Sequence, residues 1–492
     1  MSDPSTPRPV PPSGSSAGAS GGASGGGRRS AGVTRRLDVT VVLALVLPLL
    51  CAAAVVLTRP DRAPATARPP ASTALSRATV VCPAATGRGD SIALTSAAAG
   101  VRGTVSVGLG KSAVPARIAS GRVTATAPVG DGSVAVTGTD ATAPGLVAAL
   151  SAGRDVAVAP CRPPAPTQWF TGVGAGAGHT SVLELTNPDP GTAVADVTVY
   201  GRNGVVDAPR LRGISVPGAS SIQLDIGRLV PRRYELALEV VSARGRIGAS
   251  VLDRIDPVGS APLTQDWLPG QAAPATSDLL LGIAPGSAAR RTLIVANGGS
   301  DEASVTIKAV SGRSVFAPEG LPTLRVPPQS AVRVNVSRVL APLVKEGVVG
   351  LLVTGTAPVT TTLRSYVGGD VSHAVADPAI EPTVDRSATV LLPDRGAARA
   401  TLQLAGATGA GVVQVVSRTA SGRQLGRTRV EVAPQRGYAV ELPRGARLVT
   451  VTPARTTVTG AVLLTDGGGS AVVPLTAPQV NGLVPQVRPG LP

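Results

Sequence analysis

Five side chains carry most of the chemistry that this sequence of 492 residues could perform: three cysteines and two histidines. Cys51 lies in an apolar run, which leaves Cys82 and Cys161 as an even pair outside it. In an oxidising compartment, such a pair predicts one disulfide bond. Cys161 with His179 could instead act as nucleophile and base, but only if Cys161 is not bonded to another cysteine.

Neither His179 nor His373 stands in a metal-ligand spacing, so no metal site is predicted. His179 follows the glycine run Gly172–Gly178, and His373 lies in the stretch VSHAVADP, so we expect both at the surface or in loops. The glycine run matches part of a dinucleotide-binding pattern. A strand-like segment follows it, however, where a phosphate site needs a helix N-terminus. We therefore expect a flexible loop there, with no nucleotide and no cofactor.

Catalysis and nucleic-acid binding are both disfavoured by the composition. No paired carboxylates or histidines have the spacing that hydrolytic or acid–base catalysis needs, so the sequence predicts a protein that is not an enzyme. The formal net charge of +16 is carried mostly by arginine. Eight aromatic residues are too few to serve as base-stacking platforms, so nucleic-acid binding is not expected. Outside a cell, the positive charge would attract anionic wall polymers.

One segment, residues 39–58, has the character of a membrane span. Val39–Leu57 contains no charged residue and is long enough to cross a bilayer as a helix. Four arginines shortly before it favour a cytoplasmic N-terminus, with the folded bulk outside. Residues 1–38, rich in Ser, Gly and Pro, are expected to form a disordered tail. A cleaved signal peptide is the alternative, supported by the A-x-A pattern at Ala65–Ala67.

From residue 78 onward, short runs of Val, Thr and Leu alternate with polar residues and are separated by Gly, Pro, Asn and Asp clusters, as in all-β sandwiches. One pattern of strand, turn and strand recurs three times, beginning at Leu183, Leu293 and Leu402. Asn187 and Asn297, in the first two copies, are 110 residues apart. Repeats of this size favour immunoglobulin-like or fibronectin-like sandwiches.

Alternation within these repeats also predicts which side chains face the core. If the three segments begin equivalent strands, Leu185, Val295 and Leu404 all lie on the buried face. A later element recurs as well, with prolines at 217, 327 and 434. Trp267 is expected to pack an intervening segment onto a sandwich.

The predicted organisation is all-β, with tandem immunoglobulin-like or fibronectin-like sandwich repeats after a single N-terminal transmembrane helix. Its parts are a disordered cytoplasmic tail (1–38), a transmembrane helix (39–58), a Pro/Ala linker (59–77), a β module closed by the disulfide (78–162), repeat 1 (163–256), a linker (257–278), repeat 2 (279–370), a linker (371–387), repeat 3 (388–480) and a tail (481–492).

Several short segments resemble a family of actinobacterial single-pass exported proteins that carry a domain of unknown function. They are ATVVCP from Ala78, APC from Ala159, QWFTGVG from Gln168, LELTNP from Leu183 and DWLP from Asp266. The likeness runs from about Ala78 to the C-terminus. It implies the cell envelope as the compartment and no activity, and it further implies a part in envelope polymer assembly.

We therefore expect a membrane-anchored, extracytoplasmic structural or scaffolding protein of the cell envelope that binds through its sandwich loops. Its expected partners are envelope proteins or anionic wall polymers, and the membrane through residues 39–58. An accessory subunit of a membrane glycosyltransferase, or of another polysaccharide assembly system, is the alternative. An envelope hydrolase is a further alternative, for which the sequence supplies no catalytic pair.

Overall fold

The computed structural model describes residues 39–57, 70–153, 156–257, 263–286, 289–382, 387–394 and 398–484. The expected tail 1–38, most of the linker 59–77 and most of the tail 481–492 lie outside the described residues. The chain divides into two compact parts, residues 1–69 and 70–492.

In the first part, the described element is helix α1, Val39–Leu57, which is apolar and contains Pro48. Cys51 is a free, exposed cysteine on this helix. Among the helices that the described residues form, none is long and apolar enough to be a candidate membrane span. The expected transmembrane helix therefore stays a prediction from the sequence.

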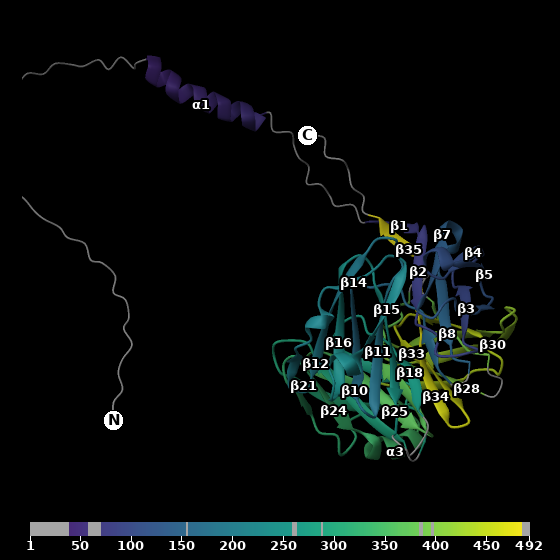
Figure 1. The fold of residues 1–492 in the computed structure, drawn as a ribbon. Helices are drawn as coiled ribbons and strands as arrows, with labels where there is room; N and C mark the ends of the chain where they lie inside the picture. Colours follow the sequence, from purple (N-terminus) through teal and green to yellow (C-terminus); the bar gives the residue numbers. More distant parts are fainter. Residues whose placement is uncertain are drawn as a thin grey trace, which may run out of the picture. The chain divides into compact units, whose positions relative to one another are not determined.

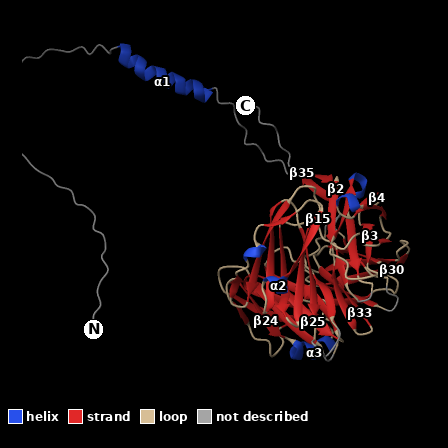
Figure 2. Ribbon diagram, in the orientation of Figure 1, coloured by secondary structure: helices blue, strands red, loops and turns tan. Residues whose placement is uncertain are grey.

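The second part is built almost wholly from β-strands, as Figure 2 shows. Four successive groups of strands follow each other along the chain, and we call them units one to four. Unit one contains β2 Arg77–Cys82, β3 Ser91–Ser96, β4 Arg102–Val107, β5 Val114–Ala119, β6 Thr124–Thr126, β7 Val134–Thr139, β8 Leu146–Ser151 and β9 Val158–Pro160. Unit two contains β10 Thr167–Gly176, β11 His179–Asn187, β12 Ala193–Gly201, β13 Gly204–Val206, β14 Ile214–Val216, β15 Ser220–Asp225, helix α2 Ile226–Leu229, β16 Arg233–Arg244, β17 Gly248–Ile255 and β18 Thr264–Leu268.

Units three and four complete this part of the chain. Unit three contains β19 Ala275–Leu281, β20 Arg290–Asn297, β21 Ala303–Ser311, β22 Val315–Phe316, β23 Leu324–Val326, β24 Ser330–Asn335, helix α3 Ser337–Lys345, β25 Val348–Val367 and β26 Asp370–Val375. Unit four contains β27 Ala388–Leu391, β28 Arg399–Ala405, β29 Gly411–Arg418, β30 Gln424–Val432, β31 Tyr438–Glu441, β32 Leu448–Ala454, β33 Thr459–Asp466 and β34 Gly469–Pro474. A ribbon of β1 Ala71–Ala74 and β35 Asn481–Val484 pairs the two ends of the part (Figure 1).

All four units share one strand order. In unit one, β2-β7-β4-β5 form one sheet and β6-β3-β8-β9 form another. Unit four repeats this arrangement with β27-β32-β29-β30 and β31-β28-β33-β34. When the strands of a unit are numbered one to eight, the two sheets have the orders 1-6-3-4 and 5-2-7-8. The segment expected to be a distinct N-terminal module is therefore another copy of the same topology.

In units two and three the two sheets are joined. In unit two, β10 pairs with both β16 and β11, so nine strands form one continuous sheet. In unit three, the 20-residue strand β25 supplies both the sixth and the seventh strand. Its first half pairs with β19 and β21, and its second half pairs with β20 and β26. Two short strands share the fourth position in each of these units.

The sequence repeat corresponds to a repeated turn in the structure. The side-chain amide of Asn187 donates hydrogen bonds to the backbone carbonyl oxygens 4, 29 and 30 residues further along the chain. Asn297 donates to carbonyl oxygens at the same three separations. Leu185, Val295 and Leu404 are all fully buried, which confirms that they lie on the core face.

Each unit's eighth strand places one side chain in the core of the preceding unit. Trp267 of β18 packs into the core of unit one, as expected of a residue that fastens a segment to a sandwich. Val472 of β34 packs into the core of unit three. At the same position of β9, Val158 packs into the core of unit four. In unit three this position is His373, which enters unit two, and Val375 of the same strand also packs into the core of unit two.

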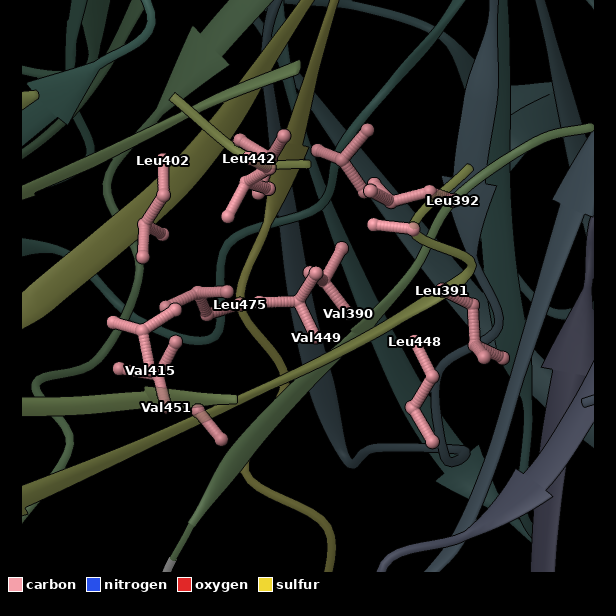
Figure 3. Close-up of a cluster of buried hydrophobic side chains, with 14 of the residues drawn as sticks. Val390, Leu391, Leu392, Leu402, Val415, Leu442, Leu448, Val449, Val451 and Leu475 are labelled. Atoms are coloured by element: carbon pink, nitrogen blue, oxygen red, sulfur yellow. The ribbon is translucent and has the colours of Figure 1, made fainter. Parts of the chain in front are cut away.

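The four units therefore close into a ring. Figure 1 shows β3, in purple, and β8, in blue, of unit one beside the yellow strands of unit four. The backbone N–H of Val123 donates to the carbonyl oxygen of Ala420 at 2.9 Å across this junction. Figure 3 shows the core of unit four, where Val390, Val449 and Leu475 lie close together, and Val158 of unit one belongs to the same cluster.

Two expected linkers differ from the structure. The stretch 257–278 contains β18 and the first residues of β19, and 371–387 contains most of β26. Each eighth strand contacts the eighth strands of both neighbouring units, so β18 and β26 run through the buried middle of the ring. Because cores are shared in this way, the units are not the separately cored sandwiches that linkers would join.

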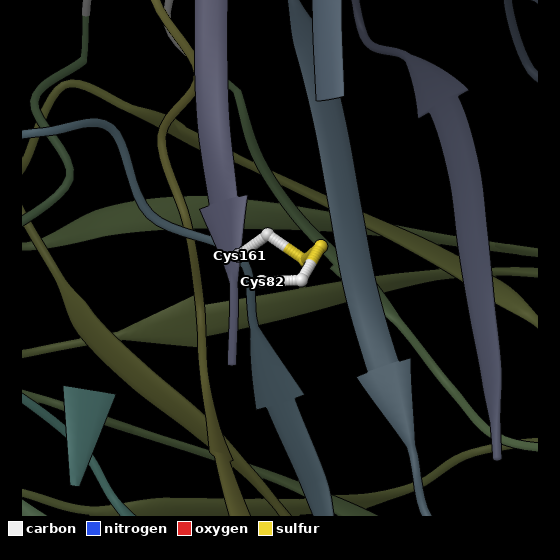
Figure 4. Close-up of a disulfide and its surroundings, with 2 residues drawn as sticks. All are labelled: Cys82 and Cys161. Carbon is white, nitrogen blue, oxygen red and sulfur yellow. A yellow bond between two sulfur atoms is a disulfide. The ribbon is translucent and has the colours of Figure 1, made fainter. Parts of the chain in front are cut away.

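The predicted disulfide is confirmed. Cys82, at the end of β2, is bonded to Cys161, which follows β9, across a sequence separation of 79 residues (Figure 4). Both cysteines lie in the core of unit one. The alternative pairing of a free Cys161 with His179 is thereby excluded, because a disulfide sulfur is not a thiolate nucleophile.

The shared cores predict that a substitution in one unit also destabilises the neighbouring unit. Val472→Asp would place an unpaired carboxylate in the core of unit three, at a cost of several kcal/mol. Because Val472 belongs to unit four, we expect limited proteolysis to open new sites in both units, between about residues 280 and 475. Thr428→Asp, on the exposed part of β30, should leave the pattern unchanged. New cleavage confined to unit four would contradict the shared core.

Candidate functional site

Both histidines of the chain bind the same buried carboxylate. Asp253 on β17 is fully buried, and its Oδ1 lies 2.8 Å from Nε2 of His179 on β11. Its Oδ2 lies 3.1 Å from Nε2 of His373 on β26, which belongs to unit three. The hydroxyl of Ser181 donates to Oδ1 of Asp253 at 2.5 Å. One carboxylate therefore ties unit three to unit two.

Strand register and a glycine bring these groups together. β11 runs antiparallel to β17 with Ser181 directly opposite Asp253, and His179 two residues earlier on the same face of β11. The imidazole ring lies against the backbone of β10 at Gly174. A Cβ atom at Gly174 would lie 2.4 Å from Cγ of His179, so a side chain there would displace the ring.

A second carboxyl group lies on the far side of His373. Oδ2 of Asp266, on β18, is 3.6 Å from Nδ1 of His373, and both side chains are buried. Burial raises the pKa of Asp266 to about 6. Burial alone would lower the pKa of His373, but its contacts with Asp253 and Asp266 raise it to about 9. Burial also opposes ionisation of Asp253, yet the two histidines hold its pKa well below the usual range.

The network continues outward from His179 through an ion pair. Nη1 of Arg364, on β25, lies 3.3 Å from a ring nitrogen of His179. The same guanidinium donates to both carboxylate oxygens of Glu235, at 3.0 and 2.6 Å. Arg333, whose side chain is largely exposed, approaches Glu235 to 3.3 Å. Burial opposes ionisation of Glu235, but the charge of Arg364 brings its pKa below the usual value.

The backbone is irregular around this ion pair. Glu235 has φ of 55°, in the left-handed region that glycine favours. The pairing of β10 with β16 shifts register twice nearby, between Thr171 and Val173 and again between Val173 and Ala175. Bulges and left-handed non-glycine residues persist where the surroundings fix them, and they cluster at functional sites.

As a whole, the network is a continuous line of acidic and basic side chains that runs from exposed Arg333 to buried Asp266. It can hold charges and protons in fixed places across the boundary of units two and three. Ser181 is fully buried and directs its proton to Asp253. Among the described residues, no three or more His, Cys, Asp or Glu side chains are grouped to hold a metal ion.

The expectation that both histidines lie at the surface or in loops is wrong. His179 is 8% exposed and His373 is 1% exposed, each within a strand. The glycine run is also no flexible loop, because β10 extends through Gly176. Apolar residues on both sides of His373 and the strand-like HTSVLEL after the glycines were the available signals. They do not reveal Asp253 as a shared partner, because it is distant from both histidines in the sequence.

By its fold this is an all-β protein whose four units close into a ring and share one strand order. Residues 113–443 match the model of a family of unknown function, DUF5719, and the chain belongs to this family. The match begins just before β5 of unit one and ends after β31 of unit four. No curated protein matches the chain.

The His373 contacts predict a loss of stability at high pH. Its folded-state pKa of about 9 exceeds the unfolded value of about 6.5, so its contribution is complete below pH 6.5 and lost as the pH rises through 9. We expect the free energy of unfolding to fall by on the order of 1–3 kcal/mol between pH 7 and 10. Denaturant titration at both pH values measures this fall.

His373→Gln serves as the comparison for this titration. The variant should be less stable at pH 7 and should lose the His373 part of the pH dependence, while the contributions of Lys and Tyr stay as they are. A variant with the same pH dependence as the unaltered protein would show that His373 is neutral in the fold.

Proposed function

We propose that this protein is an extracytoplasmic scaffold of the cell envelope, held at the membrane by the apolar segment 39–58. The observation that carries the proposal is the buried disulfide between Cys82 and Cys161, which joins the two ends of unit one. Disulfides of this kind form and persist in oxidising compartments outside the cytoplasm. The arginines before the apolar segment support the same orientation.

A structural role is supported by how the units are fastened together. Shared cores, the His373–Asp253 contact and the hydrogen bond between Thr171 and Thr360 at 2.6 Å all join neighbouring units. Rings of this kind present loops on a frame that resists deformation, which suits a scaffold. The positive net charge supports anionic wall polymers or envelope proteins as partners.

Protease added to intact, wall-stripped cells tests the orientation. We expect the folded part, after residue 70, to be digested by a high protease concentration while a cytoplasmic marker protein survives. Protection of the folded part until the cells are lysed would contradict the proposal. Release of the whole folded part into the medium would show that the apolar segment is cleaved.

The disulfide gives a second expectation. Mass mapping of a non-reduced digest of protein isolated from cells should yield one linked pair, Cys82 with Cys161. Replacing both with Ser should lower the free energy of unfolding by about 2–4 kcal/mol, because the loop that they close becomes free in the unfolded chain. The matched control is Cys51→Ser, which should leave the stability of the folded part unchanged. Two thiols that alkylate without reductant would remove the argument for an oxidising compartment.

Affinity purification from solubilised membranes distinguishes the scaffold from the accessory-subunit alternative. A scaffold should recover wall polymer or several envelope proteins at low stoichiometry. Stoichiometric recovery of one glycosyltransferase would instead support an accessory subunit of polysaccharide assembly.

A further inference from the structure

Four consecutive exposed residues, Pro231, Arg232, Arg233 and Tyr234, lead into β16 and form its first two positions, and we call them the Arg–Tyr tip. Tyr234 is 60% exposed, although aromatic residues are scarce in this chain. A large aromatic ring left in water beside two arginines is a feature that the fold itself does not require.

The backbone is left-handed at one residue of the tip and again at the residue that follows it. Arg232 has φ of 60° and Glu235 has φ of 55°, both in the left-handed region. In unit three, the residue directly before the sixth strand is Gly347, with φ of 88°. Unit two places Arg232 directly before its own sixth strand, where glycine would adopt this conformation without steric cost. This conformation makes Arg232 a candidate for a role of its own.

The position of the tip is fixed by contacts with β10 and with Arg364. The ring of Tyr234 lies on the backbone of β10, where a Cβ atom at Gly176 would be 2.4 Å from Cε1 of the ring. Glu235, the residue after Tyr234, is buried and bound on both carboxylate oxygens by Arg364. The network that ends at His373 therefore also fixes the backbone from which Tyr234 and the arginines project.

The tip carries two arginine charges. Within the described residues, neither Arg232 nor Arg233 forms an ion pair. The nearest carboxylate along the chain, Glu235, is already bound by Arg364 and Arg333. The guanidinium groups of the tip are therefore available to an anion.

We propose that the Arg–Tyr tip binds an acidic polysaccharide, with the arginines on its anionic groups and Tyr234 against a sugar ring. Guanidinium forks bind carboxylate, sulfate and phosphate groups with paired hydrogen bonds. The face of Tyr234 turned away from Gly176 is free to pack on the C–H face of a sugar. Exposed neighbours of Tyr234 along the chain are arginines and proline, whereas a lipid surface favours clustered aliphatic and aromatic residues.

This inference rests on the proposed function only for the place where the protein meets the polysaccharide, which is outside the cell. Binding itself is therefore tested with purified protein. Full-length protein in detergent is titrated with polygalacturonate, and with uncharged dextran as the neutral control, by isothermal calorimetry. The double variant Arg232→Ala/Arg233→Ala should bind polygalacturonate about tenfold more weakly or worse. Arg429→Ala/Arg436→Ala removes the same charge from exposed residues of unit four and should change binding less than about threefold.

Two single variants separate positioning from bulk charge and from unfolding. Arg232→Gly should keep or raise the melting temperature, because it relieves the left-handed arginine, and yet weaken binding. Glu235→Gln removes a negative charge, so a purely electrostatic attraction to the polymer would strengthen. We expect weaker binding instead, because a glutamine cannot hold the ion pair that fixes the tip.

Three results would overturn the proposal. One is equal weakening by the two double arginine variants. Another is tighter binding by Glu235→Gln. The third is tip-dependent binding to vesicles of anionic lipid without binding to polygalacturonate, which would assign the tip to a membrane surface. The protease experiment on intact cells tests only the orientation of the protein in the membrane. A negative result there and a negative result in the binding titration are therefore independent.

Discussion

The insertion of one eighth-strand side chain into the core of the preceding unit is the constraint on which the rest of this structure depends. Trp267, Val472 and Val158 each pack into the core of a neighbouring unit rather than into the core of their own. Burying a side chain of this kind stabilises a protein by roughly 1.5–3 kcal/mol. Because the insertions form a cycle, every unit both supplies and receives one, and removing any one weakens two units.

At one place in the cycle, a charged group takes the apolar position. His373 is desolvated like the apolar residues, but it needs Asp253 and Asp266 to offset the cost of burying its charge. Buried ion pairs contribute less net stability than apolar packing, and their value lies more in specifying a unique partner. The junction of units two and three thus combines this buried charge network with an apolar contact of Trp169 with Ala296. Two register shifts of β10 against β16 and the left-handed Glu235 lie beside the network.

Much of the local architecture could be predicted from the sequence because it follows from short-range patterns. Alternation placed Leu185, Val295 and Leu404 correctly on buried faces. The spacing of Asn187 and Asn297 identified a repeat, since an asparagine that fixes three carbonyl groups needs the same turn each time. The cysteine pair was predicted by count and compartment rather than by geometry.

What escaped prediction depends on contacts between distant parts of the chain. Unit one shares the strand order of the other units but lacks the asparagine turn. Its sequence therefore predicted a separate β module and not a copy of the repeat. The eighth strands are short and flanked by Gly and Pro, so the sequence predicts linkers in units two and three. In the structure each of these strands contacts the eighth strands of both neighbouring units. Asp253 gives no local sign that two histidines from different units converge on it.

Closing a ring with the first and last units imposes an order on biosynthesis. Val158 leaves the ribosome about 300 residues before the strands of unit four that cover it. At roughly 5–20 residues per second, unit one waits on the order of 15–60 s with an apolar face exposed. Its disulfide can form during that interval, because both cysteines belong to unit one. The covalent bond would then hold the first unit in shape until the last arrives.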